Sequence, residues 1–478
     1  MPSPPLPSRL LRAGLPLAVL ALLAWCALPG DGPKVPRELP MPAAWATPLP
    51  GGPAAPDLRS WWKAFQSPAL DALVDEALAH NLDLAAATHR LQEARLQAGR
   101  AAVQFRPAFS AGARTLQDIS ATDTYFHASI DMAWELGLFG AGEHTRAAAD
   151  ADAAASLADS QGVRVAVVAD VVRNYLDLQA ARQQLGLLDR MAGLDTRALA
   201  LAQVRRRTHT GAADDMAQAA ALAAQTRAAR AAPAEAAARA AQALSVLLGR
   251  VAPDPAWAAP GPGEPLALAP FAVTALPADL LRTRPDVQAA EAGMRKAAAS
   301  VGLARSELYP RVAITGSLLY AYNITQNRRL VSDNVPAIGP VIDIPLFDWG
   351  RRRLQVDAQQ QAFEAAVLAR ERTVRTAVAE AEGALAGLAA QQARADALAD
   401  AAAAWGGRST AAATRVRLGL ASEYDALAPQ RALLQAQMEE ATAQDARALA
   451  FVALYKALGG APLPPATAQE RAERPEAP

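Results

Sequence analysis

The sequence predicts a mixed fold in which long α-helices adjoin a short β-barrel that crosses a membrane. Three observations predict this architecture. Two proline-free segments are long enough for very long helices, three short segments have the polarity of membrane strands with a fourth assigned by symmetry, and the chain consists of two similar halves. A repeated unit that combines helices and strands indicates one large architecture rather than several unrelated domains.

Alanine accounts for the apolar character of the chain. Of 478 residues, 52% are hydrophobic but only 5% are aromatic, and stretches such as 147–158 and 397–404 are rich in alanine. Alanine favours helix and lets helices pack closely, but it buries little apolar surface per residue. The composition therefore favours long helices packed side by side over a large globular core.

Charge and motif content exclude several classes of function. The formal net charge is zero, which gives no electrostatic support to a nucleic-acid partner. The single cysteine, Cys26, excludes an intramolecular disulfide framework and a multi-cysteine metal site. The five histidines are scattered, and neither a phosphate-binding glycine loop nor a Gly-x-Ser-x-Gly motif is present. We expect no enzyme activity and no cofactor, so the energy for any transport comes from a partner.

Residues 1–26 have the features of a signal peptide of the lipoprotein type. Arg9 and Arg12 precede an apolar run at 15–28, which is followed by a polar, Pro/Gly-rich exit. The run is too short for a good membrane-spanning helix. The Leu-Ala-Trp-Cys sequence that ends at Cys26 is similar to a bacterial lipobox, although tryptophan stands where a small residue is usual. We expect lipidation, including palmitate, at Cys26; an unmodified cysteine near an ordinary cleavage site is the alternative.

Pro/Gly-rich segments separate two structural repeats. We expect an extended linker over 27–60, an equatorial linker over 250–278 and a disordered tail over 461–478. The repeats occupy 61–249 and 279–460. Their elements are helices, strands at about 107–118 and 123–139, a long helix at about 141–208 and a returning helix at 212–249 in the first, and a helix, strands at about 311–324 and 333–347, a long helix at about 351–418 and a returning helix at 422–458 in the second.

Matched landmarks and helix lengths support the repeat. Phe139 and Phe347 are 208 positions apart, and so are Gly211 and Gly419. Each long segment lacks proline over ~67 residues, or ~100 Å of continuous helix. Two shorter helices in the first half together span roughly 90 Å, so stacked end to end they nearly match one long helix. This matching predicts a cylinder wall in which unbroken helices alternate with broken ones.

Three of the four strand segments are apolar on one side only, whereas the segment at 107–118 alternates poorly and is assigned as a strand by the symmetry of the two halves. Between 123 and 136, large apolar residues alternate with polar residues that include Asp131 and Glu135, and Asp343 opposes isoleucines in the last segment. Alternation over ~10 residues suits a strand with lipid outside and water inside. We therefore expect Asp131, Glu135 and Asp343 to face an aqueous lumen. A half-buried sheet of a soluble protein gives the same alternation, but the signal peptide and the long helices favour the membrane.

The number of strands predicts the oligomeric state. Four strands cannot close on themselves, and an open edge in lipid leaves backbone groups unsatisfied at several kcal/mol each. Three copies would supply 12 strands, enough for a barrel with a water-filled lumen. Geometry therefore predicts a homotrimer.

Several sequence blocks, in order, are similar to those of a known family. They lie at 61–70, 81–84, 134–140, 280–287 and 454–460. With these blocks the chain resembles the TolC/OprM outer-membrane efflux factors, in particular the NodT-type efflux lipoprotein branch. The resemblance implies a homotrimer with a short membrane β-barrel, a long periplasmic α-barrel and a mixed α/β equatorial belt.

The resemblance also implies a function and its partners. The function is that of the outer-membrane channel of a tripartite efflux system, a passive duct that exports small toxic compounds or drugs and supports multidrug resistance. The partners are a periplasmic adaptor (membrane fusion) protein, an inner-membrane pump of the RND, MFS or ABC type, and outer-membrane lipid. Two alternatives remain: the same duct in a type I protein-secretion system, and a periplasmic coiled-coil structural protein.

The family's site residues can be placed on the turns that end the long helices, for which the sequence predicts glycine stops at Gly211 and Gly419. The implied adaptor contacts are Thr210, Gly211, Ala212, Leu418, Gly419 and Leu420, and the implied periplasmic gate is Ser422, Glu423, Tyr424 and Asp425. Ala428 stands where relatives often have a gating aspartate, so a charged ring must come from Glu423 or Asp425. Ordinary helix-end chemistry explains the same composition, through a glycine stop, a serine cap and acids at the helix N-terminus.

Overall fold

A computed structural model describes most of the chain as two compact units. The described residues are 41–51, 56–117, 123–212, 214–258, 268, 270–329 and 336–460, so Cys26, the signal peptide and the tail at 461–478 lie outside them. The sheet unit contains the described residues of 90–157 and 288–372. The helical unit contains the described residues of 40–89, 158–287 and 373–478.

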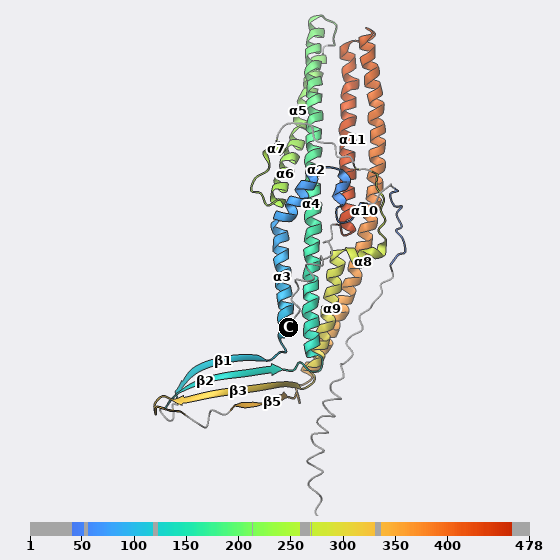
Figure 1. The fold of residues 1–478 in the computed structure, drawn as a ribbon. Helices are drawn as coiled ribbons and strands as arrows, with labels where there is room; N and C mark the ends of the chain where they lie inside the picture. Colours follow the sequence, from blue (N-terminus) through green and yellow to red (C-terminus); the bar gives the residue numbers. More distant parts are fainter. Residues whose placement is uncertain are drawn as a thin grey trace, which may run out of the picture. The chain divides into compact units, whose positions relative to one another are not determined.

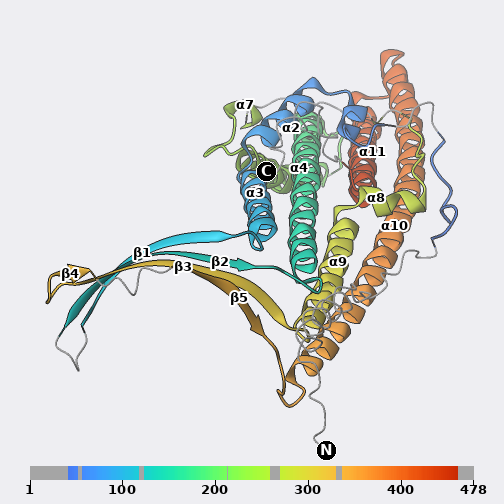
Figure 2. The same ribbon diagram turned by 60° about the horizontal axis from the view of Figure 1, so that its bottom comes forward.

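The sheet unit is built on one curved antiparallel sheet (Figure 2). Its strands are β1 (Ala108–Gln117), β2 (Thr124–Glu135), β3 (Arg311–Asn323), β4 (Arg328–Arg329) and β5 (Ala337–Asp343). β1 pairs with β2, β2 with β3, and β3 with both β5 and the two-residue β4. β1 and β5 therefore lie at the two edges. Pro340 in β5 stands opposite Ile314 in a non-hydrogen-bonded pair, so the N–H that proline lacks breaks no bond of the β3–β5 ladder.

The pairing register separates the two faces of the sheet by polarity. Asp131 in β2 stands opposite Ser110 in β1 and Ser317 in β3, and Arg311 stands opposite Asp343. The other face carries the large apolar side chains Phe109, Ile130, Met132, Trp134, Ile314, Leu318, Tyr320, Ile338 and Ile342. Several of these are largely exposed, among them Phe109 at 70% and Ile338 at 73%. An exposed apolar face opposite a polar face has the asymmetry of a membrane strand.

Four helices connect with the sheet. They are α3 (Leu82–Val103), α4 (Ala141–Arg207), α9 (Pro285–Ser306) and α10 (Arg351–Arg417). α3 and α9 have 22 residues each, and α4 and α10 have 67 each. Within the sheet unit, Met294 and Val301 of α9 pack against Phe363 of α10 as a small buried cluster.

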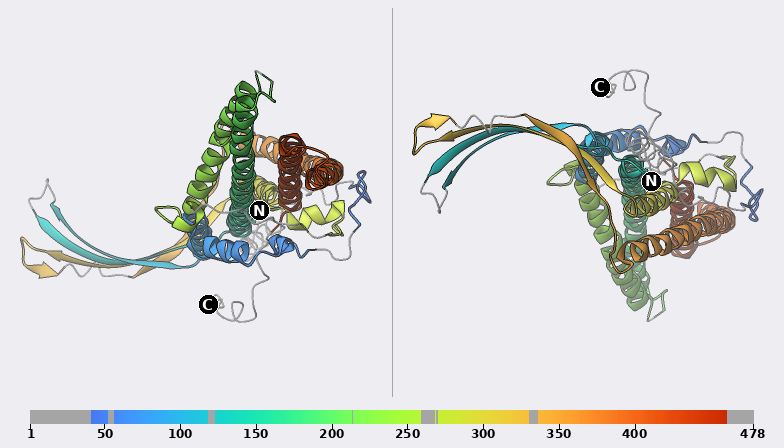
Figure 3. Two further views of the ribbon diagram at one scale, coloured as in Figure 1. Left: turned by 90° about the horizontal axis from the view of Figure 1, so that it is seen from above. Right: turned by 90° about the horizontal axis from the view of Figure 1, so that it is seen from below.

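The helical unit contains two helical hairpins. α4 returns as α5 (Asp215–Ala229) and α6 (Ala231–Leu247), and α10 returns as α11 (Glu423–Ala457). The turns of both hairpins lie at the same end of this unit (Figure 1), and Figure 3 shows the hairpins from above and from below. No described helix combines the length and the apolar content that a membrane crossing requires.

The first returning helix, which the sequence predicts as one element over 212–249, is broken at Arg230. Arg230 N–H bonds to Arg227 O, a tighter turn than the α-helix, before α6 begins. Pro233 explains the break, because its nitrogen cannot donate to the carbonyl four residues earlier and its ring crowds that carbonyl. α11 also contains a proline, Pro429, but remains a single helix.

An aromatic cluster forms much of the core of the helical unit. Trp61 lies in the short helix η1 (Trp61–Phe65), which precedes α2 (Pro68–His80), and its ring stacks on Tyr455 at 5.7 Å between centroids. Phe451 packs against Phe65 and Phe271 at 5.5 and 4.7 Å. Burial raises the pKa of Tyr455. The remaining short helices are α7 (Pro255–Ala258), η2 (Pro277–Asp279) and α8 (Leu280–Thr283).

Part of the segment predicted as a linker over 27–60 is held against the helices. Trp45 is buried and its indole N–H donates to Ala275 O at 2.6 Å. The backbone N–H groups of Ala46 and Thr47 donate to the carboxylate of Glu382 on α10, at 2.6 and 3.1 Å. These donors, the Ala46 N–H first, lower the pKa of Glu382.

The internal repeat is confirmed, but its spacing differs from the 208 positions of the matched landmarks. The left-handed residue before the long helix is Phe139 in the first repeat (φ 56°) and Trp349 in the second (φ 59°), 210 positions later. Gly249 and Gly459 close the returning helices with positive φ, and they are also 210 apart. Phe347 therefore matches Phe139 in sequence but not in conformation.

Candidate functional site

Both long helices end in the same hydrogen-bonded turn. In the first, Thr210 N–H donates to Arg205 O at 3.0 Å and His209 is left-handed (φ 56°). In the second, Leu420 N–H donates to Arg415 O at 2.8 Å and Gly419 is left-handed (φ 71°). This is a Schellman cap, in which the left-handed residue is usually glycine. The stop predicted at Gly419 lies in place, but the stop predicted at Gly211 falls on His209.

Gly211 is required for a different reason. A Cβ at this position would lie 2.9 Å from Arg205 Cβ and 2.9 Å from Asp215 Oδ2. Asp215 also accepts from the backbone N–H of Ala212 at 3.1 Å. The glycine therefore lets the turn close tightly over the end of α4. On the other turn, the candidates Leu418 and Leu420, which flank Gly419, are 65% and 68% exposed.

Helix-end chemistry accounts for two of the four candidate gate residues. Ser422 Oγ accepts from Asp425 N–H at 3.2 Å, and Asp425 Oδ2 accepts from Ser422 N–H at 3.1 Å. This reciprocal pair is a capping box at the start of α11. Hydrogen bonds from Ser422 lower the pKa of Asp425.

The other two candidates reach from α11 to α4. The carboxylate of Glu423 accepts two hydrogen bonds from the Arg197 guanidinium, both at 2.6 Å. The Arg205 guanidinium lies 4.4 Å from the centre of the Tyr424 ring, a cation–π distance. Arg205 Nε is also 3.4 Å from Asp215 Oδ2, an ion-pair distance without hydrogen-bond geometry. The bidentate bond to Arg197 lowers the pKa of Glu423.

A buried polar cluster joins the same two hairpins farther from the turns. The Asp195 side chain on α4 is only 5% exposed and forms an ion pair with Arg431 on α11. Thr226 on α5 donates to Asp195 Oδ2 at 2.5 Å and accepts from Arg431 Nη2 at 3.4 Å. A buried charge is tolerated only when it is paired and hydrogen-bonded, so this cluster fixes how α11 seats on α4.

We call the contacts between α4 and α11 the α4–α11 seam. It comprises the contacts of Asp195, Arg197 and Arg205 described above and an apolar cluster. Leu187 and Met191 on α4 pack against Leu434 and Ala441 on α11. The α4 positions recur with helical spacing, so one stripe of the helix is buried. The seam therefore has a charged part nearest the turns and an apolar part farther from them.

Sequence reasoning assigned no role to Asp195, Arg197, Thr226 or Arg431. Asp195 directly follows the apolar stripe of α4, so a charge next to a buried stripe was the available signal. Its partner was not identifiable, because Arg431 is 236 positions away.

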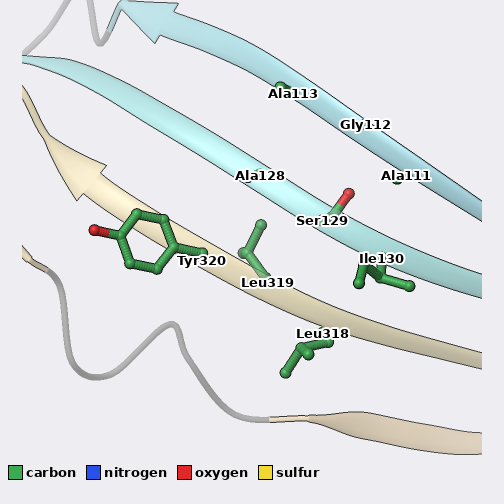
Figure 4. A pocket seen from close by; sticks show the side chains of 9 residues that line it. All are labelled: Ala111, Gly112, Ala113, Ala128, Ser129, Ile130, Leu318, Leu319 and Tyr320. Carbon is green, nitrogen blue, oxygen red and sulfur yellow. The ribbon is translucent and has the colours of Figure 1, made fainter.

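The three candidate lumen residues lie on one face of the sheet. The register places Asp131, Glu135 and Asp343 on the polar face. Asp131 accepts hydrogen bonds from Ser129 at 2.7 Å and from Ser317 at 2.6 Å. The opposite face has a hollow of about 560 Å³ where small side chains, Ala111, Ala113 and Ala128, lie among Ile130, Leu318 and Tyr320 (Figure 4).

The described residues offer no metal site. Nowhere among them do three or more His, Cys, Asp or Glu side chains gather closely enough to hold an ion.

Comparison with known proteins identifies the family. The model of the outer membrane efflux protein family matches residues 73–250 and 276–460. The chain belongs to the outer membrane efflux protein family. It is 28% identical to the pyoverdine export outer membrane protein OpmQ of Pseudomonas aeruginosa, over 92% of this chain and 96% of that protein. Nodulation protein T of Rhizobium leguminosarum bv. viciae is 27% identical over 79% of this chain and 78% of that protein.

A solved structure extends the comparison to the fold. The outer-membrane channel OprN superimposes with a TM-score of 0.73 and 28% identity, over 89% of this chain and 99% of that chain. The predicted fold class, that of the trimeric channels of this family, is confirmed. The chain is an outer-membrane efflux channel protein that extends into the periplasm. Members of the family are channels and not enzymes.

Proposed function

We propose that this chain forms the passive exit duct of a tripartite pump that carries small compounds from the periplasm to the exterior. The observation that carries the proposal is the sheet, with its exposed apolar face, its polar face and its edges at β1 and β5. Such a sheet satisfies its backbone in lipid only if the edges pair with other copies. Three copies would close the barrel with Asp131, Glu135 and Asp343 facing the water-filled lumen.

The proposed gate is the end of the α4–α11 seam. Glu423 and Tyr424 at the start of α11 are held to α4 by Arg197 and Arg205. Solvent-exposed ion pairs contribute little free energy, so contact with a partner can break them at small cost. We propose that release of these contacts lets α11 move away from α4 and widens the periplasmic end, while the buried Asp195–Arg431 cluster acts as the hinge.

The proposed partner at the turns is a periplasmic adaptor, which an inner-membrane pump of the RND, MFS or ABC type would join. The exposed leucines Leu418 and Leu420, with Gly419 between them, offer an apolar tip, and Thr210 to Ala212 form the matching turn of the other hairpin. Apolar tips that are exposed in one chain suit a protein partner. The name of OpmQ specifies export of pyoverdine, a small molecule, which supports small-molecule cargo here.

We further propose that Cys26 carries lipid. A single acyl signal binds membranes only marginally, so the barrel would supply most of the attachment. Cys26→Ser should therefore abolish incorporation of labelled palmitate and leave the protein in the outer-membrane fraction. Labelled Cys26→Ser protein would contradict the assignment.

The duct proposal is tested by deletion of the gene. A deletion strain should become more susceptible to several small toxic compounds, with rescue by the intact gene; unchanged susceptibility to a broad panel would count against efflux. Loss of one large secreted protein instead would favour the type I secretion alternative.

The gate proposal is tested in planar bilayers. Arg197→Ala should raise the conductance of the purified channel several-fold. Arg239→Ala is the matched control, because Arg239 pairs with Glu235 within one helix. Equal conductance of Arg197→Ala and wild type would contradict the gate.

A further inference from the structure

The two repeats coincide so closely that one contact between copies of the chain can be read from contacts within it. α3 begins at Leu82 and α9 at Pro285, and both have 22 residues, so this part repeats after 203 positions. α4 begins at Ala141 and α10 at Arg351, and both have 67 residues, so the later part repeats after 210 positions. The difference falls in the loops between paired strands.

The strand registers test these two spacings independently. Moving β1 by 203 positions and β2 by 210 carries the pair Ala108–Ala133 onto Arg311–Asp343. That pair is observed in the β3–β5 ladder. The repeats are therefore related residue by residue across the strand pairs β1–β2 and β3–β5.

The same shift converts the β2–β3 ladder into a ladder between β5 and β1. Within one chain β5 and β1 are at opposite edges, so the counterpart of the β2–β3 ladder must join two copies. This inference rests on the proposed function, because it needs a barrel shared between copies. We propose that β5 of one copy pairs antiparallel with β1 of the next, with Val341 opposite Arg114 and Asp343 opposite Gly112.

The polarity of the two faces supports this register. Asp131–Ser317 is a pair on the polar face, and its counterpart is Val341–Arg114. Ile342 would stand opposite Ala113, both on the apolar face. A slip by one residue would place apolar side chains of one copy next to polar side chains of the other. Arg114 and Asp343 become diagonal neighbours of opposite charge at the edge of the lumen.

Side chains near the sheet have the same counterpart relation. Phe139 stacks on Tyr309 at 5.0 Å and 14° within one chain. The equivalents are Trp349, which is 75% exposed, and Arg106, which is also exposed. The guanidinium of Arg106 in the next copy would lie on the Trp349 ring, because arginine stacks on indole as an aromatic ring does.

A glycine provides the third correspondence. Gly302 on α9 lies against the His144 ring of α4, with no room for a Cβ. The equivalents are Gly99 on α3 and Leu354 on α10. A Cβ at Gly99 would meet no described atom within 4 Å, and Leu354 is 67% exposed. The structure thus has an open glycine and an exposed leucine where the repeat requires Leu354 of one copy to lie against Gly99 of the next.

Disulfide trapping tests the register in the full-length protein in outer membranes. In the β2–β3 ladder, Leu136 N–H bonds to Val312 O, so every second residue pair from there is hydrogen-bonded and the pairs between them, which include Asp131–Ser317, are not. Side chains are closer in the non-hydrogen-bonded pairs, and Val341–Arg114 is the counterpart of such a pair. Val341→Cys with Arg114→Cys should give a covalent ladder up to trimer on oxidation. Each single variant controls for cross-links through Cys26. If β2 and β5 were equivalent after 208 rather than 210 positions, Val341 would stand opposite Gly112. Preferential cross-linking of Val341→Cys with Gly112→Cys would therefore overturn the proposed register.

The proposed β5–β1 pairing and the proposed function can be told apart by how they fail. If wild-type and variant proteins are trimeric channels but Val341→Cys with Arg114→Cys does not cross-link, the β5–β1 pairing is wrong and the duct proposal stands. If the wild-type protein is not a trimer, both are wrong.

A compensating pair of substitutions tests the helix contact. Gly99→Leu should lower the temperature at which the trimer dissociates by several degrees, because the new side chain fills the place of Leu354 from the next copy. Adding Leu354→Ala should recover at least half of that loss. A Gly99→Leu trimer as stable as wild type, or a loss that Leu354→Ala deepens, would overturn the contact.

Discussion

The two repeats agree near the sheet and differ at the turns of their hairpins. Near the sheet, helix lengths and strand registers repeat residue by residue. At the turns, the second returning helix carries Arg431, whereas the first has Ala221 at the equivalent position. The ion pairs that join the hairpins therefore use α4 of one repeat and α11 of the other.

This difference separates what a closed barrel needs from what a gate needs. A barrel shared by equal copies requires equivalent edges, so its register is kept in both repeats. The proposed gate needs one contact that can open while its neighbours stay closed, and the α4–α11 seam carries the ion pairs Arg197–Glu423 and Arg431–Asp195. Four comparisons between variants, ordered by expected effect, can break or sharpen this comparison of the repeats.

The largest effect is expected from Arg431→Ala. It leaves Asp195 buried without its ion-pair partner, which typically costs about 3–5 kcal/mol. Thermal unfolding of the purified protein in detergent measures the loss. Arg239→Ala, which removes an exposed pair within α6, should cost less than about 1 kcal/mol. Equal losses in the two variants would mean that the buried cluster does not hold the hairpins together.

Two glycines with similar conformations should respond differently to alanine. Gly419→Ala should cost about 1–2 kcal/mol, since φ is 71° and nothing lies near the added Cβ. Gly459→Ala adds a collision with the Thr283 carbonyl oxygen, which overpacking data place at about 1–3 kcal/mol more. Unfolding of the two variants side by side gives the difference, and a larger loss for Gly419→Ala would contradict the packing.

A pH-dependent effect is expected from Asp445 on α11. Burial, and then Asp177 on α4, raise the pKa of Asp445 to about 6. Burial also raises the pKa of Asp177, against the opposing charge of Arg173. A carboxyl with a raised pKa destabilises the fold when it is charged, so stability should increase as pH falls from about 7 to about 4.

Asp445→Asn should therefore stabilise the protein at pH 7.5 by on the order of 1–3 kcal/mol and have little effect at pH 4. Glu423→Gln is the matched control, because the pKa of Glu423 is lowered and its contribution is lost only as pH falls below the ordinary range. Unfolding curves across pH measure both variants. A gain from Asp445→Asn that grows toward pH 4 would contradict the sign.

The smallest effects are expected at the prolines of the two returning helices. Pro429→Ala restores a missing hydrogen bond inside the continuous α11 and should stabilise by about 1 kcal/mol. Pro233→Ala should gain less, because the chain has already broken at Arg230, but amide exchange around 229–233 should slow. A larger gain at Pro233 would show that this break is strained.

Much of the fold could be predicted because its signals are local. The alternation from Thr124 to Glu135 and the proline-free stretch from Ala141 to Arg207 each specify one element from neighbouring residues. The candidate site was predicted only in part. Ser422 and Asp425 follow helix-capping rules, whereas the partners of Glu423 and Tyr424 lie on a helix more than 200 positions earlier.

The sequence by itself determined the kinds of elements, their order, their repetition and the polarity of the two sheet faces. The tertiary structure decided that His209 rather than Gly211 ends α4, that Asp195 meets Arg431, and that the later part of the repeat has a spacing of 210 rather than 208 positions. The physical reason is range. Helix and strand patterns arise from residues a few positions apart, but a cap conformation or an ion pair depends on how two distant segments are registered against each other.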